Sequence, residues 1–118
     1  MSSLQEQMRG RTKQFALRIV RLFQALPRRD EARILARQLL RSGTSVAANY
    51  RAAGRARSKA EFISKRVIEE ADETVFWLEL LVEAGILPEN RVKDLLGEAN
   101  ELPAIFAASR ATAMKGTR

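Results

Sequence analysis

The stretch that decides the fold class runs from Val67 to Pro88 and reads VIEEADETVFWLELLVEAGILP. Its small and apolar side chains recur at steps of three and four residues, at Val67, Ala71, Thr74, Leu78 and Leu81. This heptad-like spacing places them on one face of an α-helix, as in helices that pack together. Pro88 suits the first turn of a following helix, because proline lacks only a backbone donor that is unused there. The stretch therefore predicts a long helix that ends near Gly85 and another helix after it.

The same period extends outward in both directions, without any β-strand alternation. An apolar stripe before Pro27 predicts one helix, and Asp30 and Glu31 suit the N-terminus of the next. The core-like positions of that second helix are Ile34, Leu35, Leu39, Val46 and Tyr50. The run from Ser58 to Glu61 has the Ser-x-x-Glu pattern of a capping box. In the last segment, Pro103 is expected to bend or break the helix.

These signals predict an all-α protein with a single domain over residues 1–118. The expected helices span 5–26, 30–53, 58–84 and 88–114. Their short connections force successive helices to run antiparallel, which gives an up-down-up-down bundle with left-handed packing.

The amino-acid composition excludes several classes of functional site. The chain has 118 residues, 46% of them hydrophobic, and it contains neither cysteine nor histidine. Nucleophilic systems built on histidine, thiolate metal sites and disulfides are thereby excluded. Without an apolar run long enough to cross a bilayer or a secretory signal pattern, we expect a cytoplasmic protein with no membrane contact. We expect no enzyme activity and no cofactor.

Charge is unevenly distributed along the chain. Residues 1–59 hold 14 basic and three acidic side chains, a net charge of +11, whereas residues 60–118 hold seven and 11, a net charge of −4. A basic half suits binding to a polyanion, and it equally suits basic helices that lie against acidic ones, within or between subunits.

The candidate nucleic-acid contacts are basic side chains of the second helix and the loop after it: Arg37, Arg41, Arg51, Arg55, Arg57 and Lys59. Their guanidinium groups could grip phosphates. Because Tyr50 is the only aromatic residue nearby, stacking with bases is poorly supported. A solvated face, or one paired across an interface, is the alternative.

A polar stripe follows one face of the same helix, at Gln38, Ser42, Ser45 and Asn49. It could bind a ligand, but small polar residues also let helices approach closely and form hydrogen bonds across the contact. We favour this structural role and call these four residues the polar helix seam. The acidic run Glu69, Glu70, Asp72 and Glu73 lacks the histidine of a bundle di-metal site, so no metal is expected.

Four consecutive apolar residues, from Val75 to Leu78, cannot all face one core, because a helix turns by about 100° per residue. Either Phe76 or Trp77 lies partly exposed, or a second apolar face serves self-association. We favour self-association, and the expected subunit interface comprises Val75, Phe76, Trp77 and Tyr50.

The residues from Gln38 to Arg51 read QLLRSGTSVAANYR and resemble the bacterial four helix bundle protein family, which includes the 23S rRNA intervening-sequence proteins. The resemblance continues through the acidic run and the apolar run after it, and covers residues 10–113. It implies a left-handed four-helix bundle, a homopentamer and no catalytic activity. A related protein, the accessory variability determinant of diversity-generating retroelements, binds a reverse transcriptase and nucleic acid.

Two functions follow as hypotheses. The first is a homo-oligomeric scaffold that binds RNA or DNA through its first two helices. The alternative is a protein-protein interaction module whose basic face meets an acidic partner or a neighbouring subunit.

Overall fold

The computed structural model describes residues 3–55 and 60–116, and the side chains of residues 4–55 and 61–108. These ranges form four α-helices, α1 (Ser3–Ala25), α2 (Asp30–Arg55), α3 (Ala60–Glu83) and α4 (Glu89–Gly116), and contain no β-strand. The all-helical fold class is confirmed for this part of the chain. The helix ends differ from the expected bounds by two residues at most.

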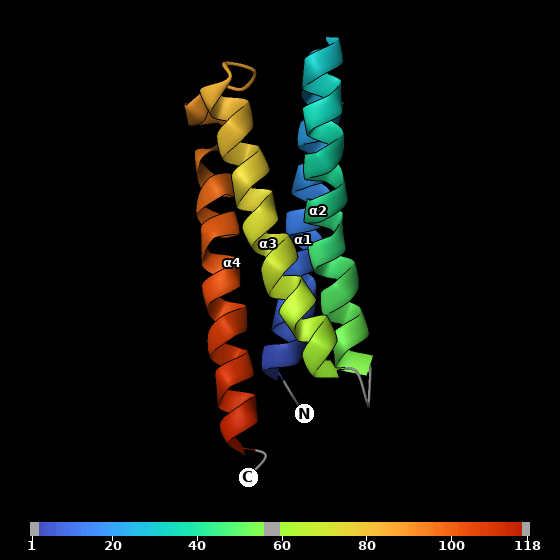
Figure 1. Cartoon of the computed structure of the whole chain (residues 1–118), viewed down its shortest axis with the longest axis vertical. Coiled ribbons are helices and arrows are strands. Elements are labelled where there is room, and N and C mark those ends of the chain that lie inside the picture. Colours follow the sequence, from blue (N-terminus) through green and yellow to red (C-terminus); the bar gives the residue numbers. More distant parts are fainter. Residues whose placement is uncertain (1–2, 56–59, 117–118) are drawn as a thin grey trace.

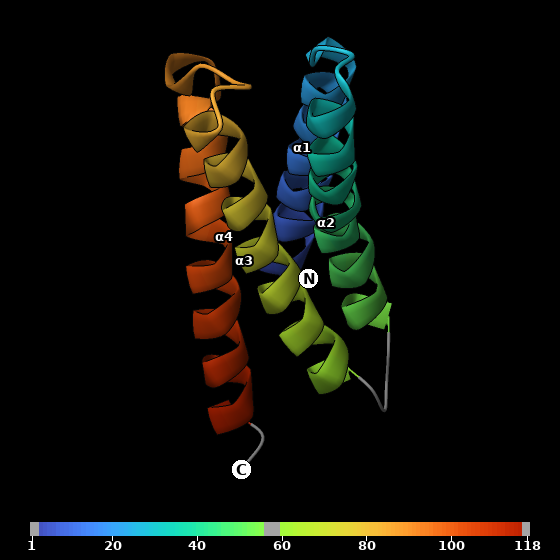
Figure 2. The same ribbon diagram turned by 45° about the horizontal axis from the view of Figure 1, so that its top comes forward.

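The chain reverses its direction at each connection (Figure 1). Helices that follow one another pack together, α1 on α2, α2 on α3 and α3 on α4, whereas α1 and α4 approach closely at far fewer positions. Seen from a second direction, α1 and α2 stand together on one side, and α3 and α4 on the other (Figure 2). The α2–α3 contact therefore holds the two pairs together along a molecule 51 Å long.

The end of α3 shows how a single glycine sets a boundary. Gly85 has a φ of 76°, which is unfavourable for residues with a Cβ. Its N–H donates to the Val82 carbonyl at 3.0 Å, and the Ile86 N–H donates to the Leu81 carbonyl at 3.0 Å. This is a Schellman motif, in which glycine lets two free carbonyls of the last turn find partners. Ile86 is buried beside it and closes the end of the helix.

The core lies along the helix faces that the periodicity predicted. Phe15, Ile19, Leu39, Leu78 and Leu81 are almost completely buried. The α1–α2 contact is unusually close at Gly43, where an added Cβ would lie 2.8 Å from Cγ1 of Ile19. Since real Cβ atoms do not approach that closely, a larger residue at position 43 would push α1 away from α2.

Ile34 was expected on the core side of α2, and this expectation is wrong, because 61% of its surface is exposed. The buried face of α2 passes through Ala32, Ala36 and Leu39. At about 100° per residue, Ile34 lies roughly opposite Ala32 and Ala36. The direction of Ile34 around the helix axis, not its size, therefore keeps it out of the core.

Pro103 does not break the last helix, since α4 continues on both sides of it. Proline removes one backbone donor from the helix, but its fixed φ is compatible with helical geometry. Ala99, Leu102 and Phe106 flank Pro103 and are all buried. Packing on both sides of the proline therefore outweighs the lost hydrogen bond.

The expected capping box lies only partly within the described residues. Ser58 and Lys59 fall outside them, and α3 begins at Ala60. The acidic residues Asp30 and Glu31 lie in the first turn of α2, as the sequence predicts. Pro88 was expected to be the first residue of the last helix, and it lies one residue before α4.

Candidate nucleic-acid interface

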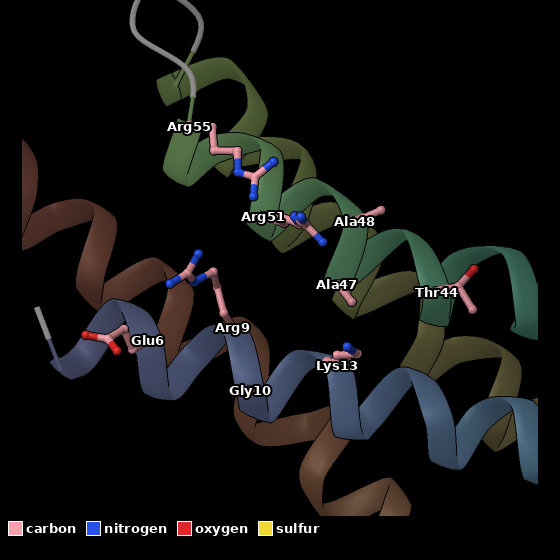
Figure 3. Close-up of a pocket in the computed structure, with 9 residues that line it drawn as sticks. All are labelled: Glu6, Arg9, Gly10, Lys13, Thr44, Ala47, Ala48, Arg51 and Arg55. Carbon is pink, nitrogen blue, oxygen red and sulfur yellow. The ribbon is translucent and has the colours of Figure 1, made fainter.

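An open groove runs along the outer side of the α1–α2 contact. It has a volume of about 650 Å³, and it is lined by Glu6, Arg9, Gly10 and Lys13 from α1 and by Thr44, Ala47, Ala48, Arg51 and Arg55 from α2. We call these nine residues the basic groove. Figure 3 shows Gly10 on α1 and the two alanines on α2, with Arg9 reaching from α1 toward α2. The hollow exists because small residues occupy its centre while long cationic side chains stand at its sides.

Each wall contributes two cations spaced four residues apart, Arg9 and Lys13 on α1 and Arg51 and Arg55 on α2. This spacing places both members of a pair on one face of their helix, about 6 Å apart along its axis. All four side chains are exposed, and within the described residues none forms an ion pair. Against them stands the single carboxylate of Glu6, so the lining carries a net charge of +3.

The predicted nucleic-acid contacts divide into several groups. Arg51 and Arg55 line the basic groove. Arg37 is exposed on α2 about four turns before Arg51 and lies outside the groove. Arg57 and Lys59 lie outside the described residues. Arg41 lies outside the groove lining, and its guanidinium is paired with carboxylates of the same chain.

Arg41 joins α2 to α3. Its Nη1 lies 3.2 Å from Oε2 of Glu70, and its Nη2 forms a second ion pair with Glu73. Glu70 is buried, and its other oxygen lies 3.7 Å from Nη2 of Arg66. The indole N–H of Trp77 donates to the Glu73 carboxylate at 2.8 Å. Part of the acidic run therefore neutralises part of the basic helix within one chain.

A second ion-pair cluster joins α1 to α4, and sequence reasoning missed it. The Arg11 guanidinium donates from Nε to Glu98 at 2.6 Å and from Nη2 to Glu101 at 2.7 Å. These hydrogen bonds raise the pKa of Arg11. The Arg11 hydrogen bond is also the main reason that the pKa of Glu98 lies below its usual range, although burial opposes the shift.

Arg9 and Lys13 are the groove residues that sequence reasoning did not single out. Their only signal is a pair of cations four residues apart around Gly10, within the basic half of the chain. Many exposed helices carry such a pair, so the sequence offered no reason to select this one. They become candidate phosphate contacts only because they line the same groove as Arg51 and Arg55.

The polar helix seam is a real contact at one position only. Ser42 is buried, and its Oγ lies 3.0 Å from Oγ1 of Thr74 on α3. Gln38 is exposed and accepts a hydrogen bond from Nε of Arg41 at 3.3 Å. Ser45 and Asn49 are half-buried, and within the described residues neither forms a side-chain hydrogen bond.

The residues expected at a subunit interface are not equally accessible. Phe76 is 53% exposed, while Val75 and Trp77 are half-buried and pack against the core. The Phe76 and Trp77 rings meet edge to face, with centroids 4.9 Å apart. Tyr50 is half-buried and stacks on Phe106 at 5.4 Å, so its ring is committed to the α2–α4 side of the molecule.

The described residues contain neither a helix suited to cross a membrane nor a cluster suited to hold a metal ion. Over residues 3–55 and 60–116, no helix is long and apolar enough to cross a membrane. The same residues contain no group of three or more carboxylate side chains placed to hold a metal ion.

Comparison with known proteins identifies relatives of the whole bundle. The family model described as 23S rRNA-intervening sequence protein matches residues 5–108. A crystal structure of a protein of unknown function from the S23 ribosomal protein family of Bacteroides thetaiotaomicron VPI-5482 is similar, with 29% sequence identity and a TM-score of 0.80. The match covers 86% of this chain and 96% of that one. Among curated proteins, the search found no match.

Proposed function

This chain belongs to the 23S rRNA-intervening sequence protein family, and we propose that it is a non-enzymatic helical scaffold that binds nucleic acid through the basic groove. One observation carries the proposal. Four exposed cations, from two helices, face one hollow and have no carboxylate partner within the described residues. A phosphate backbone would supply the missing negative charge and release its condensed counterions.

Two arginines outside the basic groove differ from these four cations. Arg41 and Arg11 are both neutralised by glutamates of the same chain. Placing an arginine against a phosphate is favourable only where no internal carboxylate already occupies it. The basic groove meets this condition, and the α2–α3 surface does not.

Self-association belongs to the same proposal. The exposed ring of Phe76, next to Trp77 on the outer face of α3, supports a second apolar face that another subunit would cover. A left-handed bundle that forms a homopentamer is what the family resemblance implies. In such an assembly the basic grooves of several subunits would act together on one long polyanion, which raises the effective affinity.

The non-enzymatic part of the proposal follows from the side chains present. The chain contains no histidine and no cysteine, and the titratable groups of the groove are four cations and one exposed carboxylate. Such a set can bind and neutralise phosphates, but it offers no arranged acid and base pair. The proposal also places the protein in the cytoplasm, as the sequence pattern predicts.

The test is light scattering of the purified protein, alone and with a mixed-sequence RNA, at about 50 and 200 mM salt. We expect an oligomer whose mass grows with RNA at low salt and grows much less at high salt. The double variant Arg51→Gln/Arg55→Gln should abolish most of that growth. Its matched control is Arg21→Gln/Arg28→Gln, which removes the same charge from exposed positions outside the groove.

Three outcomes would count against parts of the proposal. An oligomer indifferent to RNA would favour the alternative, a module that binds an acidic protein partner. A monomer would remove the self-association. Equal losses in the two double variants would mean that total charge, and not the groove, drives binding.

A further inference from the structure

We infer that the basic groove recognises the sugar-phosphate backbone of a double-stranded nucleic acid and does not read or stack on bases. This inference rests on the proposed function and specifies its ligand. It makes duplex RNA, of any sequence, a better ligand than single-stranded RNA of the same length.

Within the described residues, the groove offers no aromatic ring on which a base could stack. Proteins that bind single strands without sequence preference stack successive bases on aromatic rings. The chain has seven aromatic residues, five Phe, one Trp and one Tyr, and none of them lines the groove. A single strand lying there would leave its bases in water.

The aromatic rings nearest to the groove pack against, or belong to, other helices. Tyr50 precedes Arg51 in α2, but its ring stacks on Phe106 of α4. Burial raises the pKa of the Tyr50 phenol, which agrees with a ring turned into the protein. The exposed rings of Phe62 and Phe76 belong to α3, which forms neither wall of the groove.

The groove lining also has little capacity to form hydrogen bonds with base edges. Readout of adenine commonly uses the amides of Asn or Gln, which present a donor and an acceptor together. Within the described residues, the groove lining contains no Asn or Gln, and Thr44 is its only uncharged polar side chain. Arg9 and Arg55 extend into the space between the two helices, where a phosphate strand lying along the groove would meet them (Figure 3).

Charge density then favours the duplex. A double helix carries twice as many phosphates per unit length as one of its strands. Each phosphate that the protein neutralises also releases more counterions from a duplex, about 0.9 per contact, than from a single strand, about 0.7 per contact. With all four cations engaged, this difference amounts to about sixfold in affinity at 0.1 M salt. The same count predicts that duplex affinity falls about 150-fold between 50 and 200 mM salt.

The experiment measures fluorescence anisotropy of labelled RNA with the full chain. The probes are an unstructured single strand, the duplex made from it, and a second duplex of unrelated sequence. Each probe has about 20 base pairs or nucleotides. At about 3.4 Å per base pair, such a duplex is longer than the 51 Å length of one subunit. We expect the two duplexes to bind equally, within about twofold, and the single strand about sixfold more weakly.

A gain-of-function variant makes the test independent of lost binding. Ala48 is exposed in the groove, so Ala48→Tyr adds a ring without disturbing the core. If the groove lacks only a stacking platform, this variant should tighten single-strand binding about tenfold and leave duplex binding nearly unchanged. Ala52→Tyr, exposed on α2 but outside the groove lining, is the matched control and should change neither.

The outcomes separate the inference from the function beneath it. Single-strand binding that equals or exceeds duplex binding, or a strong preference for one duplex sequence, would overturn the inference while nucleic-acid binding stands. If Arg51→Gln/Arg55→Gln changes the binding of no probe, the proposed function fails and the inference fails with it.

Discussion

Arg41 and Arg51 stand ten residues apart on α2, and their surroundings differ completely. Arg41 faces α3, where Glu70 and Glu73 both reach it. Arg51 faces α1, which presents Arg9 and Lys13 on the other side of the groove. The comparison teaches that a basic helix has no single function, because the helix packed beside each residue decides whether its charge is used internally or left for a partner.

Removing the buried acid should have the largest effect on this comparison. Glu70→Ala deletes the carboxylate that receives both Arg41 and Arg66, and we expect it to lower the free energy of unfolding by about 2 kcal/mol. Chemical denaturation measures this change. Glu69→Ala is the matched control, because Glu69 is exposed, and it should stay within about 0.5 kcal/mol. Equal effects at the two positions would mean that the α2–α3 ion pairs contribute nothing.

Substituting the two arginines separately should divide stability from binding. Arg41→Gln should lower stability by about 1 kcal/mol and change RNA affinity by less than about twofold. Arg51→Gln should leave stability nearly unchanged and weaken RNA binding about eightfold at 0.1 M salt, the effect of one phosphate contact. Denaturation and anisotropy on the same two proteins check this. A result in which both variants weaken RNA binding equally would contradict the comparison.

The close approach at Gly43 sharpens the comparison from the α1 side. Alanine at a helix interior normally stabilises by up to about 1 kcal/mol, but here the new Cβ meets the buried Ile19 side chain at 2.8 Å. We expect Gly43→Ala to destabilise by about 1 kcal/mol after that gain is included. Gly97→Ala is the control, since nothing lies within 4 Å of its Cβ position, and it should stabilise. Thermal unfolding of both variants gives the sign directly.

The α1–α4 ion pairs should have the smallest effect and should depend on pH. The folded-state pKa of Glu98 is lowered by its hydrogen bond to Arg11, so its stabilisation is present above the unfolded value of about 4.3. It disappears as the pH falls through the lower folded value. We expect the wild type to exceed Arg11→Gln in stability by less than about 1 kcal/mol at pH 7, and by nothing at strongly acid pH. A difference independent of pH would assign the effect of Arg11 to packing.

Some parts of the candidate site were within reach of sequence reasoning. Arg51 and Arg55 could be selected because they belong to a dense basic segment on one helix face. Arg9 and Lys13 could not be selected, since their importance depends on α2 lying opposite. Arg41 was assigned to the same set as Arg51 because both occur in the same segment, and nothing local distinguishes them.

The ion pairs explain this limit in physical terms. Arg41 and Glu70 are 29 residues apart, and Arg11 and Glu98 are 87 apart. Coulomb attraction depends on the distance in space, and that distance is fixed only after the helices pack. Ile34 shows the same limit for apolar residues, because it was assigned to the core although it lies on the opposite side of α2 from the buried Ala32 and Ala36.

By itself, the sequence determined the four helices and their ends. Helical hydrogen bonds join residues four apart, and the signals that stop them, Pro27 and Gly85, act within a few residues. The tertiary structure alone decided which helices became neighbours, and therefore which cations met a carboxylate and which were left facing an open groove. It also kept α4 helical across Pro103, because packing of the flanking buried residues outweighs the local cost of a proline inside a helix.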